Sequence, residues 1–238
     1  MTGDCRSTGA GPIPAGRSEV STMSLRTKIS GGVGLAVGAA AASYPLLWRR
    51  WCLNWGATPD ETAGDLPGDE LLPDPDLLAT RAITIGAPPD AIWPWLVQMG
   101  SGRGGAYTYD WIENLLRLDM HSADEILPQF QDVKVGDEFP LGRTGKNMRV
   151  EVLDPEAAFT IGFADRTWVW IFALVPVPGG TRLISRNRIA TPGASALGRL
   201  FTMLFMEPGS LVMERKMLLG IKERAERLAR DRVAEPAA

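Results

Sequence analysis

The side chains best suited to proton transfer lie close together in the sequence. Asp110 and Glu113 carry carboxyl groups, Tyr107 carries a phenol, and His121 is the single histidine among 238 residues. Groups of these types act as general acids and bases when they face a substrate in an enclosed site. Asp110 and Glu113, however, are also typical of a solvated helix face, and His121 suits a loop or a capping position. We therefore assign no catalytic residue, keep His121, Asp110 and Glu113 as weak candidates, and favour a binding protein over an enzyme.

A second stretch, Gly100-Ser-Gly-Arg-Gly-Gly105, matches a known sequence motif, the G-x-G-x-x-G of dinucleotide-binding loops. That motif needs a strand before the glycines and, after them, a helix whose N-terminus receives the pyrophosphate. Here the glycines follow an amphipathic helix that begins near Pro88. Gly100 is suited to cap that helix, and the run predicts a flexible connection to a second helix over 106–116. We expect no nucleotide to bind here.

Composition excludes several other kinds of site. With one histidine and two cysteines, Cys5 and Cys52, the chain cannot build a multi-histidine or multi-cysteine metal site. We expect no metal and no cofactor. The net charge of −3 lacks the basic excess of nucleic-acid-binding proteins, so no nucleic-acid partner is expected. Eight tryptophans against three tyrosines suit a core or the wall of an apolar cavity.

The N-terminal part of the chain contains one long apolar segment. Residues 1–28 lack hydrophobic periodicity, which predicts a disordered N-terminus, and translation starts at Met1 or at Met23. Residues 29–48, ISGGVGLAVGAAAASYPLLW, contain no charged residue and are long enough to cross a hydrocarbon core of roughly 30 Å. We expect a single transmembrane helix in the cell membrane. Basic residues flank both of its ends, so the side on which the rest of the chain lies stays open.

Two further interpretations concern the same segment. Alanines 40–42 would suit the cleavage site of a signal peptide, although apolar residues continue to Trp48 and favour an uncleaved anchor. Gly34, Gly38 and Ala42 form a stripe of small residues through which two such helices could pack as a homodimer.

The next segment, residues 49–79, has the composition of an acidic, proline-rich linker. Its part from 56 to 79 contains seven acidic residues and four prolines but no Lys or Arg. Like charges repel one another, and prolines favour an extended chain. We expect this linker to hold the membrane helix apart from a folded domain over residues 80–230.

Residues 80–230 combine strand and helix signals in an order typical of an α+β domain. Segments with period-two alternation predict strands over 80–85, 135–141, 148–153, 159–163, 167–175 and 181–189. On the last strand, Leu183, Ser185 and Asn187 share one face, and arginines share the other. The segment 167–175, TWVWIFALV, is apolar on both faces. It therefore predicts a central strand without indicating which face is turned toward the core.

The chain ends in a long helical pattern. Apolar residues recur at helical spacing over 197–204 and again over 211–228, with an interruption expected at Glu207-Pro-Gly209. Residues 231–238 are expected to be a disordered tail. A strand, two short helices, a run of antiparallel strands and a long final helix form the order of a helix-grip fold.

Four segments carry a resemblance to a known family: WGATPDE, LPGDELLPDPDLLATRAITIGAPPDAIWPWLVQMG, GRGGAYTYDWIENLL and KVGDEFPLG. They resemble membrane-anchored actinobacterial members of the START-like (SRPBCC) superfamily, whose related families include polyketide cyclase/dehydrase and lipid-transport proteins. The resemblance extends over residues 44–228. It implies a curved antiparallel sheet wrapped around the last helix, with a deep apolar cavity between them.

The implied fold nominates residues for the wall of that cavity. These ligand-binding candidates are Tyr107, Trp111, Met148, Phe163, Trp168, Trp170, Asn187, Met203 and Met213. The resemblance thus favours a membrane-anchored protein that binds or carries an apolar small molecule such as a lipid, polyketide or isoprenoid. Two other functions stay open: a cyclase or dehydratase acting on a polyketide-like substrate, and a membrane-associated interaction or regulatory module without a ligand.

Overall fold

The computed structural model describes residues 43–142 and 147–234. By its internal contacts the chain divides into two units, residues 1–44 and residues 45–238, and the sheet and helices below belong to the second. The expected disordered N-terminus, most of the membrane segment 29–48 and the stripe Gly34, Gly38 and Ala42 lie outside the described residues. Within the described ranges, no helix has both the length and the apolar character needed to cross a bilayer.

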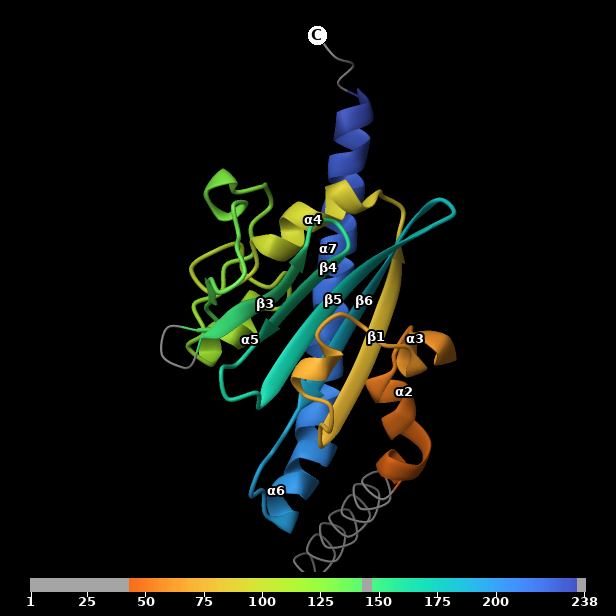
Figure 1. The fold of residues 1–238 in the computed structure, drawn as a ribbon, viewed down its shortest axis with the longest axis vertical. Helices are drawn as coiled ribbons and strands as arrows, with labels where there is room; N and C mark the ends of the chain where they lie inside the picture. Colours follow the sequence, from red (N-terminus) through yellow and green to blue (C-terminus); the bar gives the residue numbers. More distant parts are fainter. Residues whose placement is uncertain (1–42, 143–146, 235–238) are drawn as a thin grey trace, which may run out of the picture. The chain divides into compact units, whose positions relative to one another are not determined.

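Six antiparallel strands form one sheet in the order β1-β6-β5-β4-β3-β2 (Figure 1). The strands are β1 (Leu77–Ile85), β2 (Glu138–Phe139), β3 (Met148–Asp154), β4 (Ala158–Gly162), β5 (Trp168–Val177) and β6 (Gly180–Ile189). Five of them coincide closely with the strands that alternation predicts. The segment over 135–141 yields only the short β2, since Pro140 has no N–H with which to continue the ladder.

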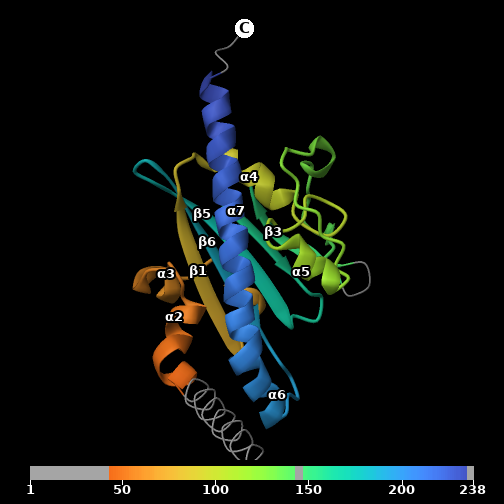
Figure 2. The same ribbon diagram turned by 180° about the vertical axis from the view of Figure 1, so that it is seen from behind.

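One face of this sheet, here called the inner face, is covered by the long helix α7 (Glu207–Ala234) (Figure 2). The shorter helices are α4 (Pro89–Val97) and α5 (Asp110–Leu115). Ile92 on α4, Phe159 and Phe172 on the sheet, and Leu218 on α7 are fully buried in one core cluster. A six-stranded antiparallel sheet packed on a long C-terminal helix is the α+β arrangement expected from the order of elements.

The opposite, outer face of the sheet carries the second part of the segment that the sequence predicts to be an extended linker. Within residues 49–79, α2 (Arg49–Leu53) packs against α7 and β1, and α3 (Pro59–Ala63) and η2 (Asp69–Leu71) follow it. A capping box at Thr58 and Glu61 begins α3. Residues 56–73, which we call the strap, run over the outer face, where Ala57 and Leu66 pack against a small apolar cluster of the sheet. The folded unit therefore begins well before residue 80.

Arginines of β6 explain why this acidic segment is ordered. Arg186 donates hydrogen bonds to the carbonyl oxygens of Gly64 and Glu61, at 2.9 and 2.6 Å, and pairs with the Asp69 carboxylate. Arg188 donates to the other Asp69 oxygen at 2.8 Å, and Arg182 binds the Glu61 carboxylate at 2.7 Å. Glu61 and Asp69 are thus counter-ions of the sheet, and these ion pairs oppose the repulsion that would extend the chain.

The C-terminal helix differs from its predicted form at the expected interruption. The helical backbone continues from α6 (Ala196–Phe201) through the π-helical turn η4 (Thr202–Met206) into α7. Pro208 lacks the N–H that an α-helical ladder would use at this position, and a widened π turn directly before it accommodates the loss. The helix also extends to Ala234, into the expected tail, while residues 235–238 lie outside the described part.

The glycine run forms a closed turn and not the flexible connection that its composition suggests. The N–H of Gly100 donates to the carbonyl of Gly105 at 2.9 Å, and the reverse hydrogen bond is 3.1 Å long. Gly105 has φ +69°, and a Cβ there would come within 2.7 Å of the His121 backbone. A residue without a side chain is needed at this crossing. The run lies between α4 and α5, so it has no strand before it as a dinucleotide loop requires.

Candidate functional site

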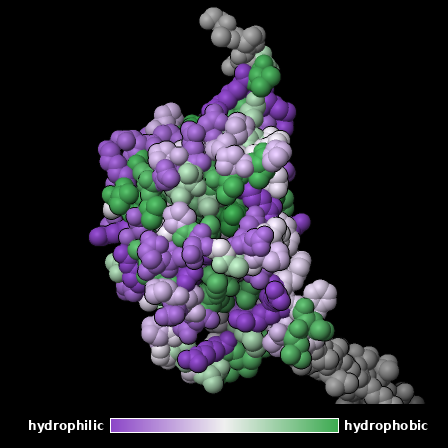
Figure 3. All heavy atoms as spheres, turned by 45° about the vertical axis from the view of Figure 1, so that its right-hand side comes forward, coloured by the Kyte–Doolittle hydropathy of each residue, from purple (hydrophilic) through white to green (hydrophobic). Residues whose placement is uncertain are grey.

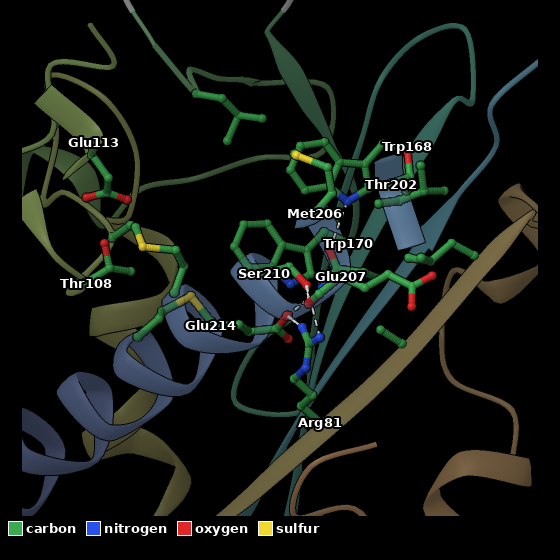
Figure 4. Close-up of a pocket in the computed structure, with 18 of the residues that line it drawn as sticks. Arg81, Thr108, Glu113, Trp168, Trp170, Thr202, Met206, Glu207, Ser210 and Glu214 are labelled. Carbon is green, nitrogen blue, oxygen red and sulfur yellow. Dashed lines mark hydrogen bonds and ion pairs between the residues drawn. The ribbon is translucent and has the colours of Figure 1, made fainter. Parts of the chain in front are cut away.

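A cavity of about 790 Å³ lies between the inner face of the sheet and the helices α6 to α7 (Figure 4). This volume is in the range of small-molecule binding sites. The wall is predominantly apolar and includes Leu77, Ala79, Met99, Leu118, Met120, Phe139, Leu141, Trp168, Trp170, Ile189, Met203, Met206, Met213 and Met217. Its six methionines have flexible side chains, which suits a surface that must adapt to a ligand.

The two ends of the cavity differ in exposure. Asp76, Arg199 and Ser210 are exposed wall residues located where β1 begins and where α6 leads into α7. At the other end, Phe139 and Glu113 are buried. We call these the open and closed ends of the cavity. A ligand would enter beside α6 and extend toward α5.

The indole side chains on β5 are fixed by partners on β6. Trp170 Nε1 donates to Ser185 Oγ at 2.9 Å, and Trp168 Nε1 donates to Asn187 Oδ1 at 2.8 Å. The two indoles stack with centroids 5.9 Å apart, and Trp170 also contacts the ring of Phe172. Because each N–H has a partner, the rings present their apolar faces to the cavity. The inner face of β5, which its sequence leaves undecided, is the face with these indoles.

Beneath the indoles lies a buried ion pair between Arg81 of β1 and Glu214 of α7, whose side chains are 1% and 6% exposed. Arg81 also donates to the carbonyl of Cys52 at 3.1 Å and to Ser210 Oγ at 3.0 Å. Glu214 accepts hydrogen bonds from Ser185 Oγ at 2.7 Å and Asn187 Nδ2 at 3.1 Å. Residues from β1, β6 and α7 thus form one connected network in the cavity wall (Figure 4).

Two effects act in opposite directions on the charge of this network. Burial raises the pKa of Glu214, whereas the Arg81 guanidinium and the Ser185 hydroxyl lower it. Arginine keeps its proton in proteins, so the pair is stable only while Glu214 supplies the matching charge. A second pair at the open end joins Arg49 to Glu207 at 2.9 Å. Both cations named here have an acidic partner within the wall.

Glu113 and Thr108 occupy the closed end, apart from that network (Figure 4). Burial raises the pKa of Glu113, and the nearby Asp110 carboxyl raises it further, while the neighbouring Thr108 hydroxyl lowers it. Even so, Glu113 Oε2 and Thr108 Oγ1 are both buried without a hydrogen-bond partner of normal geometry among the described residues. Of the three catalytic candidates, Glu113 is the one that lines the cavity.

The structure brings together five of the nine nominated ligand-binding residues. Trp168, Trp170, Asn187, Met203 and Met213 all line the cavity. They come from β5, β6, η4 and α7, so the cavity lies between the inner faces of two strands and one side of the final helix. Contact of these residues with a ligand stays a prediction.

The other four nominated residues lie elsewhere. Tyr107 is buried in the core, where its hydroxyl donates to the Trp95 carbonyl at 2.9 Å, and Met148 is also a fully buried core residue. Phe163 packs edge-on against the outer side of Trp168 as part of the same aromatic cluster, and Trp111 is 70% exposed on α5. Helical spacing grouped Tyr107 with Trp111, but Tyr107 precedes α5 and has φ +57°, which separates the two rings.

The remaining acid–base candidates lie outside the cavity wall. The Asp110 carboxylate accepts hydrogen bonds from the N–H and the hydroxyl of Ser122, at 2.9 and 2.6 Å. His121 is 76% exposed, next to Asp119. Burial raises the pKa of Tyr107 far above its usual value, so its phenol keeps its proton. Within residues 43–142 and 147–234, no group of three or more His, Cys, Asp or Glu is arranged to hold a metal ion.

Sequence reasoning missed the polar network, although a signal was present. Arg81 is in phase with Ile83 and Ile85 on β1, and Glu214 is in phase with Leu211 and Leu218 on α7. A charged residue in register with the apolar residues of its own element must be buried with them. One such cation and one such anion indicate a buried pair.

No protein-family model and no curated protein matches this chain. Matching solved structures include a Polyketide_cyc-like protein from Corynebacterium glutamicum, with 19% identity and a TM-score of 0.32 over 66% of this chain and 91% of that chain. The Aha1 dimer from Colwellia psychrerythraea matches with 16% identity and a TM-score of 0.37, over 63% and 96% of the two chains. A protein from Nitrosomonas europaea matches with 14% identity and a TM-score of 0.40, over 68% and 99%. All three TM-scores are below 0.5.

Proposed function

We propose that this protein binds or carries an apolar small molecule in the cavity between the sheet and α7, as a START-like domain. The observation that carries the proposal is the cavity itself: about 790 Å³, apolar over most of its wall and open at one end. A wall of indole and methionine side chains favours a lipid, polyketide or isoprenoid over a charged metabolite. The sequence resemblance to START-like proteins supports the same class of ligand.

Trp170→Ala should weaken binding of an apolar ligand by tens-fold. Burying an aromatic side chain contributes on the order of 2–3 kcal/mol, and each 1.4 kcal/mol is about a tenfold change in Kd. The measurement is displacement of the neutral fluorescent probe N-phenylnaphthylamine from the purified protein. Trp111→Ala is the matched control, because Trp111 is exposed and does not line the cavity. Equal loss in both variants would contradict the proposal, and absence of any probe binding would favour an interaction module without a ligand.

A cyclase or dehydratase is the second candidate, and the position of Glu113 favours it. A buried carboxyl with a raised pKa in an apolar cavity is a suitable general acid. If the protein is an enzyme, the wild type should turn over a polyketide-like substrate, and Glu113→Gln should abolish this turnover while it still binds the substrate. Binding without turnover leaves the carrier as the function.

We further propose that the open end of the cavity lies next to the membrane. Large apolar side chains are exposed there: Leu46, Leu47, Trp48, Trp51, Leu197, Leu200, Phe201, Phe205 and Met206. Figure 1 shows α2 and α6 at the same end of the unit, and Figure 3 shows exposed apolar side chains at its lower end, interspersed with charged ones. Arg49 pairs with Glu207, so residues 45–48, which directly precede Arg49, lead to the start of α7.

Membrane attachment predicts that the full chain stays in the membrane pellet after a carbonate wash. A variant without residues 29–42 should bind membranes only peripherally through the exposed apolar side chains, so carbonate should release it. Release of the full chain, or a mature N-terminus near Ser43, would exclude the anchor. The second of these results would instead identify residues 29–42 as part of a cleaved signal peptide.

A further inference from the structure

The closed end of the cavity contains two buried polar groups whose hydrogen-bonding capacity is unused. Glu113 is 6% exposed and lines the cavity together with Thr108. The two side chains are neighbours, since Thr108 lowers the pKa of Glu113, but Glu113 Oε2 and Thr108 Oγ1 form no hydrogen bond of normal geometry with each other or with any other described residue. A polar atom that is buried and unpaired destabilises the folded state, because it has lost its hydrogen bonds to water. Two such atoms at one place therefore indicate a site that a further molecule completes.

Both groups can turn toward the cavity without a change in the backbone. The final torsion of a glutamate side chain is broad and nearly two-fold, so its two carboxyl oxygens exchange by a half-turn. The Thr108 hydroxyl hydrogen rotates freely about its C–O bond. Figure 4 shows the two side chains near one another at the edge of the cavity opposite Trp168 and Thr202. A ligand group placed there can meet both.

The surroundings of Glu113 indicate which chemical group fits. Among the described residues, no basic side chain forms an ion pair with it, and its one charged neighbour is the acidic Asp110. Arg81 and Arg49 are both paired with other acids in the wall. A phosphate or carboxylate at the closed end would lie against the Glu113 carboxyl, and the described wall residues at this end include no Lys, Arg or His. A neutral hydroxyl can instead donate to the Glu113 carboxyl group, and a neutral hydroxyl or carbonyl oxygen can accept from the Thr108 hydroxyl.

We propose that Glu113 and Thr108 form a polar recognition site for one neutral oxygen function, a hydroxyl or a carbonyl, on an otherwise apolar ligand. The inference rests on the proposed function, since it specifies the ligand of the same cavity. It selects against hydrocarbons, which leave both polar atoms unpaired, and against ligands that would place an anionic group at the closed end. Glu113 here is a binding residue, and no bond of the ligand is made or broken.

The test compares three compounds of one shape: naphthol, naphthalene and naphthoate. Their dissociation constants are measured by calorimetry on the purified full chain, after subtraction of partition into the same carrier detergent. Naphthol should bind about two- to tenfold more tightly than naphthalene, the value of one neutral hydrogen bond, and naphthoate more weakly than either. Glu113→Leu should remove the advantage of naphthol and leave naphthalene binding intact, while Thr108→Val should reduce it.

Two variants control the interpretation. Glu113→Gln keeps a neutral group that donates and accepts, so it should retain the preference for naphthol. His121→Ala, at an exposed position outside the wall, should leave all three affinities unchanged. Equal affinity for naphthol and naphthalene in the wild type, or an unchanged preference in Glu113→Leu, would overturn the inference and leave an unselective apolar cavity. If none of the three compounds binds, the proposed function fails, and the inference fails with it.

Discussion

Glu214→Ala should lower the free energy of unfolding by about 3–5 kcal/mol, the usual cost of removing one partner from a buried ion pair. The substitution leaves the Arg81 guanidinium 1% exposed and without its carboxylate. Ser185 and Asn187 lose an acceptor in the same step. A domain is typically stable by only about 5–15 kcal/mol, so the variant should unfold at a much lower urea concentration. The measurement is the urea midpoint at constant slope.

A double variant distinguishes the cost of leaving Arg81 without its partner from the general cost of substituting residues at this site. Arg81→Met combined with Glu214→Leu removes both charges and fills the space, and should recover most of the stability lost in Glu214→Ala. Glu223→Ala, on an exposed position of the same helix, should change stability by no more than about 0.5 kcal/mol. A Glu214→Ala variant as stable as Glu223→Ala would contradict the role given to the pair.

The ion pair also determines how the cavity wall is ordered. Ser185 and Asn187 each connect Glu214 to one of the two indoles, through hydrogen bonds of 2.7 to 3.1 Å. Loss of Glu214 should therefore free Trp168 and Trp170 to change orientation. A charged network under an apolar wall thus serves binding indirectly, because rigid aromatic rings lose less entropy when a ligand binds.

The strands could be predicted from the sequence because residues of different character alternate along most of them. On β6 the arginines lie on the outer face, beneath the strap. Leu183, Ser185 and Asn187 were assigned to one face of β6, and they all turn inward. The same rule could not orient β5, whose residues are apolar on both sides because both of its faces are buried. Trp168 and Trp170 were therefore nominated as cavity residues from the implied fold and not from their own alternation.

The strap and the site depended on information that a single segment does not hold. Residues 49–79 have a linker's composition, and their order follows from arginines more than a hundred residues later on β6. The closed end of the cavity also depends on contacts between segments that are distant in the sequence. Glu113 appears as one charge of a short helix until the fold places it, buried, in the cavity wall. Pairing between distant segments, more than local propensity, decided both cases.

Removing Arg186 should release the strap from the sheet. Arg186→Met removes the guanidinium that donates to Glu61, Gly64 and Asp69. These acceptors, which lie between the strap and the sheet, then lose that donor. We expect a loss on the order of 3 kcal/mol and, more specifically, faster hydrogen exchange confined to residues 56–73. The β5–β6 hairpin should keep its protection, since its ladder does not involve the Arg186 side chain.

Arg149→Met is the matched control, because Arg149 is an exposed arginine on β3 of the same sheet, and its exchange pattern should equal that of the wild type. Unchanged protection of residues 56–73 in Arg186→Met would mean that apolar contacts of Ala57 and Leu66 suffice to hold the strap. A released strap would become the extended acidic chain that its composition describes. Helix α2 should keep its protection in the same variant, because Arg49 and Cys52 are bonded to Glu207 and not to Arg186.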